Sequence, residues 1–170
     1  MSLNAGLLKE TFERAGKENG GLRHLGMRFY ERLFEKYPQV RPLFQTPPEE
    51  QHKKLMASVG SIIASVTSPE QMGPYLHAMG IRHLAYKTEP GHYPAVGENL
   101  VAVLAEHLSV EGEWTGEMKA TWEAALQAVS SIMIEAAENP DAFRNELIQA
   151  GYQPDGTRSL DTTPWVLSVS

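Results

Sequence analysis

The chain has 170 residues, 42% of them hydrophobic, and a formal net charge of -6 at pH 7. This size and composition suit one domain with one sizeable core. The absence of cysteine excludes disulfides, thiolate zinc sites and cysteine nucleophiles, and leaves histidine and carboxylate as the strong metal ligands. The 15 lysines and arginines are mixed with glutamates, so no nucleic-acid-binding surface is expected.

The amino terminus gives no sign of a targeting segment. Its first residues, MSLNAGLLKETFERAGKENG, lack a basic region followed by an apolar stretch, and no window approaches the length of a membrane span. We therefore expect a cytoplasmic protein that has no contact with a membrane.

Helical periodicity runs from the start of the chain to about Glu138, and alternating strand-like runs are missing. Apolar or small residues recur every three or four positions between Leu22 and Phe34, which predicts a helix with one buried face. The stretch KYPQVRPLFQTPPEE is rich in proline and predicts an irregular corner that contains Phe44.

A second well-determined helix is predicted to begin at PPEEQHKKL, because proline and glutamate favour the first turn of a helix. Gln51 lies one turn before Leu55 on its buried side. Further helices are predicted around His77 and His83, in AVGENLVAVLAEHL, and from about Thr115 to Glu138. The fold class is therefore all-α, with about six to eight helices packed around a cavity.

The sequence changes character after Glu138. A short helical stretch, PDAFRNELIQAGY, is followed by the polar QPDGTRSLDTTPWVLSVS, which has little to bury. We divide the chain into a helical domain, residues 1–138, and a C-terminal extension, residues 139–170, made of a short helix and an irregular tail.

Three stretches, RFYERLFEKYPQVRPLF, QHKKLMASVG and RHLAYKTEPGHYPAVGENL, follow one another in an order and at separations that resemble a known family. The chain resembles a single-domain bacterial haemoglobin related to the globin domain of flavohaemoglobins. The resemblance covers about Leu7 to Glu138. It implies a globin fold, a haem b cofactor (iron protoporphyrin IX), and O2, NO or CO as ligands.

A lone histidine in an arbitrary helix is most often a core residue bonded to a backbone carbonyl. The resemblance implies instead that His83 is the axial metal ligand of the haem iron. A neutral imidazole is a good donor to ferrous iron, and a single axial histidine leaves the opposite position open for a diatomic gas. Tyr93 and Val96 belong to the cofactor-binding residues that the resemblance implies.

The chain departs from the flavohaemoglobin pattern at the acidic residue near this histidine. When Trp122 is aligned with the tryptophan of the last globin helix, Ala137 occupies the position of the glutamate. Glu135 and Glu138 lie nearby, but a shift of one residue turns a helical side chain by about 100 degrees. We therefore expect a backbone carbonyl of its own helix to bond the second ring nitrogen of His83, which disfavours peroxidase-like chemistry.

The resemblance also implies a distal pocket formed by Tyr30, Gln51 and Leu55, with Phe44 wedged against the haem. Tyr30 and Gln51 can donate hydrogen bonds, which favours bound O2 over CO, while Leu55 would exclude water. His52 adjoins Gln51, and a shift of one residue would bring its imidazole over the iron. Gln51 is preferred because it pairs with Leu55 at i+4, although coordination by two histidines stays open.

Three basic residues are candidates to meet a haem propionate. Lys53 and Lys54 would lie near the rim of the pocket, and Arg82 directly precedes the axial histidine. For each of them, the alternative is a solvated surface charge.

Three candidate functions are consistent with these residues and this resemblance. The first is reversible O2 binding, with NO and CO as further ligands. The second is an NO dioxygenase with Tyr30 and Gln51 as candidate catalytic residues. It would need an external reductase, because no glycine-rich dinucleotide fingerprint follows a strand. The third is a gas or redox sensor that signals through the tail, where Trp165 and Val166 could contact a partner.

Overall fold

The computed structural model describes residues 4–44, 48–66, 69–84 and 88–157. These residues form seven α-helices and one 3-10 helix, and contain no strand. In chain order they are α1 (Ala5–Lys17), α2 (Gly21–Lys36), η1 (Pro38–Leu43), α3 (Pro48–Val66), α4 (Pro69–Arg82), α5 (His92–Leu108), α6 (Gly116–Glu138) and α7 (Pro140–Gln149). The all-α prediction is confirmed. Residues 158–170, including Trp165 and Val166 of the expected signalling tail, lie outside the described residues.

Local sequence signals account for where several helices begin. The Asn4 side chain accepts a hydrogen bond from the Leu7 amide at the start of α1, and the Thr115 hydroxyl accepts one from the Met118 amide at the start of α6. Helix α3 begins at Pro48, where no helical hydrogen bond is lost, and two glutamates follow at the positive end of its dipole. The predicted start of this helix is therefore confirmed.

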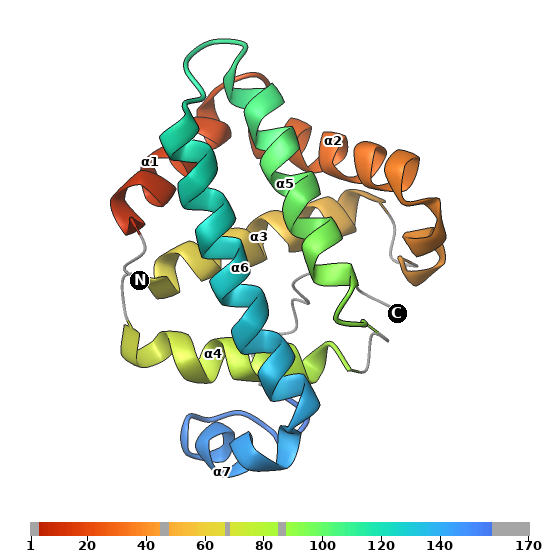
Figure 1. Ribbon diagram of the computed structural model, residues 1–170, viewed down its shortest axis with the longest axis vertical. Coiled ribbons are helices and arrows are strands. Elements are labelled where there is room, and N and C mark those ends of the chain that lie inside the picture. Colours follow the sequence, from red (N-terminus) through yellow and green to blue (C-terminus); the bar gives the residue numbers. More distant parts are fainter. Residues whose placement is uncertain (1–3, 45–47, 67–68, 85–87, 158–170) are drawn as a thin grey trace.

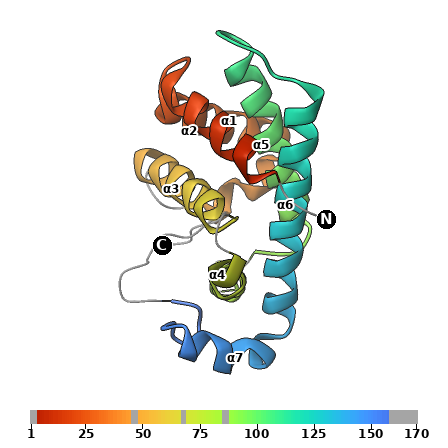
Figure 2. The ribbon, with the colours of Figure 1, turned by 90° about the vertical axis from the view of Figure 1, so that its left-hand side faces the viewer.

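The helices are arranged around α6, which runs along most of the long axis of the molecule with α5 beside it (Figure 1). Helices α3 and α4 lie on the same side of α6, and α7 lies beyond α4 at one end of the molecule (Figure 2). Trp122 of α6 is almost fully buried in the main core, where its indole Nε1 donates to the Thr11 hydroxyl of α1 over 2.8 Å. This buried bond ties the first helix to the long one.

Glycine allows a very close approach between α4 and α6. A Cβ atom added at Gly80 would overlap the backbone carbonyl of Met133 in α6, so only glycine lets the two helices meet at this point. Ala78, Met79 and Gly80 are all buried. The second half of α4 is thus firmly seated against the long helix.

A second, smaller core joins α4 to the C-terminal extension. It contains five buried residues: Ala78, Ile81, Ala136, Leu147 and Tyr152. The extension therefore packs on the other helices at least as far as Tyr152. Among the described residues, no helix is long and apolar enough to cross a membrane.

Candidate functional site

The side chains of Tyr30 and Gln51 meet in the interior. Tyr30 lies in the second half of α2 and Gln51 in the first turn of α3, and both are almost fully buried. The Nε2 amide of Gln51 donates to the Tyr30 hydroxyl oxygen over 3.1 Å. Because the hydroxyl accepts this bond, its own hydrogen can be donated to a third group. Two residues that the sequence analysis assigned to one pocket therefore contact each other.

Leu55 and Phe44 lie close to this pair. Leu55 follows Gln51 by one turn of α3 and is 1% exposed. The Phe44 ring, at the end of η1, meets the Tyr30 ring edge-on, with 5.3 Å between centroids. The Phe44 ring places apolar atoms against Tyr30, and a less polar surrounding strengthens a hydrogen bond.

His52 takes a different position from its neighbour Gln51. Its ring is stacked on the Tyr30 ring at 5.4 Å and 19°, and its Cβ lies close to Gly26 of α2. Burial lowers the pKa of His52, partly opposed by the charge of Glu49. The two neighbours thus contact Tyr30 differently: Gln51 bonds its hydroxyl, whereas His52 stacks on its ring.

A cavity of about 580 Å³ opens beside these residues, at the corner between α2, η1 and α3. Its wall includes Tyr30, Phe44, Gln51 and His52. The Oε1 atom of Gln51 is buried and has no hydrogen-bond partner within the described parts of the chain. A buried acceptor without a partner is costly, and such atoms are often explained by a group that binds there.

His83 directly follows the last residue of α4 and is 1% exposed. Its Nδ1 lies 2.6 Å from the Met79 carbonyl oxygen, which can only accept, so Nδ1 carries the hydrogen. Burial lowers the pKa of His83 to about 3, although the Met79 bond acts in the opposite direction. The ring is therefore neutral at pH 7, with its lone pair on Nε2.

The predicted backbone partner of this imidazole is confirmed, since Met79 precedes it by one helical turn. Glu135 and Glu138 are both exposed. Neither carboxylate bonds the ring in place of that carbonyl.

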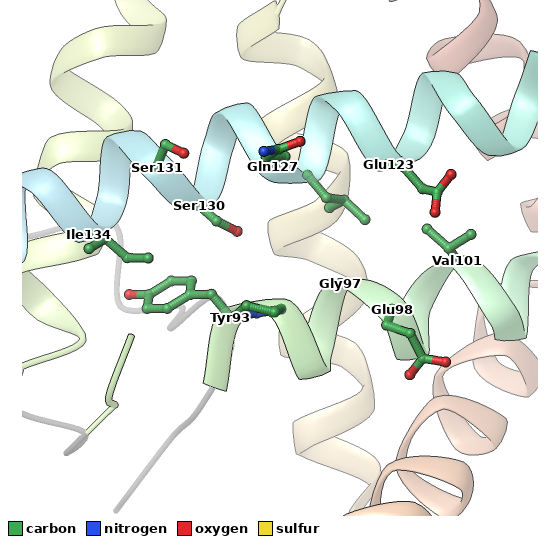
Figure 3. A pocket seen from close by; sticks show the side chains of 11 residues that line it. Tyr93, Gly97, Glu98, Val101, Glu123, Gln127, Ser130, Ser131 and Ile134 are labelled. Atoms are coloured by element: carbon green, nitrogen blue, oxygen red, sulfur yellow. The ribbon is translucent and has the colours of Figure 1, made fainter. Parts of the chain in front are cut away.

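Tyr93 and Val96 lie buried in the first part of α5. The Tyr93 ring is 6.4 Å from the His83 ring, and burial raises its pKa. Figure 3 shows the Tyr93 ring pointing toward Ile134 of α6, at one end of a groove of about 380 Å³ between α5 and α6. Tyr93 thus lines this groove and has its ring near that of the histidine.

The candidate propionate residues differ in exposure. Lys53 is exposed and Lys54 is half-buried on α3, whereas Arg82 is only 2% exposed. The positive charge of Arg82 lowers the pKa of both His83 and Asp155, in each case as a smaller cause. Arg82 is therefore no solvated surface charge.

Sequence reasoning missed the contacts between α4 and the C-terminal extension. His77 Nδ1 lies 2.8 Å from a carboxylate oxygen of Glu146 in α7, and its ring packs 4.1 Å from the Phe143 ring. Gly156 rests on the end of α4. The Asp-Gly pair at 155 and 156 was a turn signal, but nothing in the sequence indicated what the turn would contact.

Comparison with known proteins gives a consistent picture. The family model described as Globin matches residues 27–133. A flavohemoprotein of Burkholderia sp. is 31% identical over 146 residues, which are 84% of this chain and 36% of that protein. An uncharacterized globin-like protein of Aquifex aeolicus is 31% identical over 118 residues, which are 69% of this chain and 81% of that protein.

A solved structure of a bacterial globin from Campylobacter jejuni shares the fold, with a TM-score of 0.67 at 23% identity. The alignment covers 81% of this chain and 96% of that globin. The chain spans about a third of the length of the flavohemoproteins it matches.

Proposed function

The chain belongs to the globin family, and on this premise we propose that it binds haem b through His83 and reversibly holds O2 in the pocket of Tyr30 and Gln51. Globins are haem-based gas-binding proteins, so the cofactor and the class of ligand follow from the family. The choice of O2 depends on the hydrogen bond between the two distal residues, which is the observation that carries the proposal.

The residues present fit a haem. The neutral His83 ring carries its lone pair on Nε2, the form in which imidazole donates to a metal. Beside the Tyr30–Gln51 pair, Leu55 and Phe44 offer apolar surface to a flat ring. Lys54 and Arg82 are proposed to meet the propionates, and Tyr93 and Val96 to line the side of the histidine.

Held by His83, a haem would supply an iron atom that can bind a diatomic gas. The Tyr30 hydroxyl would keep its proton and donate a hydrogen bond to a ligand that carries partial negative charge. Gln51 keeps that hydroxyl aimed by donating to its oxygen. Leu55 and Phe44 exclude water, so the donated bond is not replaced by one to solvent.

The bond between His83 and Met79 favours gas binding over peroxidase-like chemistry. A carboxylate that accepts the ring hydrogen makes imidazole more basic, whereas a neutral carbonyl does so less. In this chain the acceptor is the Met79 carbonyl. We therefore propose a binding protein as the first function.

NO dioxygenase activity is the second candidate, favoured by the similarity to flavohemoproteins. The same donors, Tyr30 and Gln51, would then hold O2 while it reacts with NO. Each cycle would require one electron, which we propose comes from an external reductase.

Absorption spectra of the haem-loaded protein in ferric, ferrous and oxygenated forms test the first function. We expect a five-coordinate ferrous spectrum and a long-lived oxygenated form. A six-coordinate ferrous spectrum, or no stable oxygenated form, would contradict it.

Stopped-flow mixing of the oxygenated protein with NO tests the second function. Sustained conversion of NO to nitrate in the presence of a cell-extract reductase would establish the dioxygenase. A single turnover without recovery would leave gas binding as the function.

A further inference from the structure

The turn that follows α7, residues 152–157, lies against the end of α4 just before His83. Gly156 has a φ of 87°. A Cβ atom added there would overlap the Ala78 carbonyl oxygen and lie 2.9 Å from the backbone nitrogen of Arg82. Ala78 and Arg82 are four residues apart, so these backbone atoms face each other across one turn of α4. Gly156 therefore covers the backbone of the last helical turn of α4.

This turn of α4 also orients the candidate axial ligand. The Met79 carbonyl oxygen accepts two hydrogen bonds from His83, one from its backbone amide over 3.0 Å and one from its ring Nδ1 over 2.6 Å. Met79 directly follows Ala78, the residue that Gly156 contacts. A movement of the 78–82 backbone would therefore move the carbonyl that fixes the imidazole.

The same turn of α4 is confined on a second side. Gly80 lies against the Met133 carbonyl of α6 so closely that no side chain fits. With Gly156 against Ala78 and Arg82, the backbone from 78 to 82 is confined by both α6 and the extension. Contact from two sides leaves little freedom for this segment to shift.

The turn at 152–157 is itself well fastened. Gln153 donates to the Thr157 carbonyl over 2.7 Å, and Gly156 donates to the Gln153 carbonyl over 2.9 Å. The Asp155 carboxylate accepts from the Thr157 amide and hydroxyl at 3.0 and 2.6 Å. The turn can therefore act as a rigid support.

Helix α7 adds an anchor at His77, directly before this turn of α4. The pair of His77 and Glu146 at 2.8 Å joins the two helices, and Phe143 packs on the His77 ring. The Tyr152 amide donates to the Leu147 carbonyl over 2.8 Å, which connects the turn to the end of α7. Helix and turn thus hold α4 as one unit.

We propose that the turn at residues 152–157 is a positioning element for His83, in which Gly156 fixes the last turn of α4 and so the Met79 carbonyl that orients the imidazole. These residues lie outside the matched globin region, which ends at 133. The inference rests on the proposed function, because it takes His83 as the iron ligand.

Two glycine substitutions provide a matched test. Gly151 and Gly156 have φ values of 95° and 87°, so an added methyl group strains both backbones similarly. A Cβ at Gly151 would meet nothing within 4 Å, whereas one at Gly156 would overlap the Ala78 carbonyl. Gly151→Ala therefore controls for strain, and Gly156→Ala tests contact with α4.

Two readouts report on the position of His83. In the ferrous haem protein, we expect Gly156→Ala to shift and broaden the iron–histidine stretching band in the resonance Raman spectrum. In the haem-free protein, we expect it to speed amide hydrogen exchange at Met79 to Leu84 by about tenfold. Gly151→Ala should change neither.

A band and exchange rates that are the same in Gly156→Ala and Gly151→Ala would overturn the positioning role alone. A wild-type spectrum without an iron–histidine band would overturn the assignment of His83, and the positioning role with it. If Gly156→Ala does not fold, Asp155→Ala unfastens the turn without added bulk. It should then shift the band in the same way, and an unmoved band would again overturn the proposal.

Discussion

Tyr30 remains a hydrogen-bond donor across the physiological pH range. Burial raises its pKa well above the ordinary value, and the bond from Gln51 only partly offsets this. We therefore expect Tyr30→Phe to speed O2 dissociation by about 10 to 100 times, the range for loss of one good hydrogen bond to a partly charged acceptor. Stopped-flow displacement of O2 by CO measures the rate.

Tyr37→Phe is the matched control for this substitution. The Tyr37 hydroxyl bonds Glu98 over 3.4 Å near the surface, away from the pocket. An equal acceleration in both variants would show that the Tyr30 hydroxyl does not touch the gas ligand.

Gln51 and His52 are neighbours with separate expected roles. Gln51→Leu removes the group that aims the Tyr30 hydroxyl, so we expect O2 dissociation to speed up by about tenfold. His52→Leu removes only a ring stacked on Tyr30, so the ferrous absorption spectrum should stay five-coordinate. A wild-type spectrum that changes from six- to five-coordinate in His52→Leu would show instead that this ring reaches the iron.

The buried His83 makes the stability of the haem-free protein depend on pH. Its pKa is about 3 when folded and 6.5 when exposed, so between these values only the unfolded chain takes up the proton. The stabilisation is therefore complete above pH 6.5 and is lost as the pH falls toward 3, by about 1.4 kcal/mol per pH unit at most.

Urea unfolding of wild type and His83→Gln at several pH values isolates this effect, because the other titrating groups are shared. The difference in unfolding free energy should be constant above pH 6.5 and should shift against the wild type below it. A difference that stays flat from pH 7 to 4 would mean that the ring is accessible to protons.

At the scale of the elements, α7 and α4 are joined by a partly buried pair. The His77 side chain is 16% exposed and that of Glu146 is 40% exposed. We expect Glu146→Ala to lower the unfolding free energy by about 0.5 to 1 kcal/mol. Arg144→Ala breaks an exposed pair with Asp141 on the same helix and should cost less. Urea unfolding measures the stability of the two variants. If Arg144→Ala proved less stable than Glu146→Ala, the expected order would be wrong.

The helices themselves could be predicted because their signals are local. Apolar spacing indicated a helix over Leu22 to Phe34, and the structure extends it only to Gly21 and Lys36. The packing of α7 could not be predicted. His77 and Glu146 lie 69 residues apart, and periodicity shows which face is buried but not which element covers it.

At the scale of the whole molecule, the candidate site combines residues that could be predicted from the sequence with residues that could not. Gln51 was chosen over His52 because Leu55 follows at i+4, and in the structure Gln51 is the residue that bonds the Tyr30 hydroxyl. The role of Gly156 was not visible, because it depends on how closely two backbones approach and not on any side chain. Such contacts leave no trace in a single sequence beyond a glycine.

The confinement of α4 has a consequence for assembly. Gly80 against Met133, Gly156 against Ala78, and the α7 anchor are contacts within the protein, so none of them requires the cofactor. The histidine side of the site should therefore be folded before haem binds. Haem uptake would then be a single bimolecular step whose rate rises in proportion to haem concentration, without a slow folding phase to limit it.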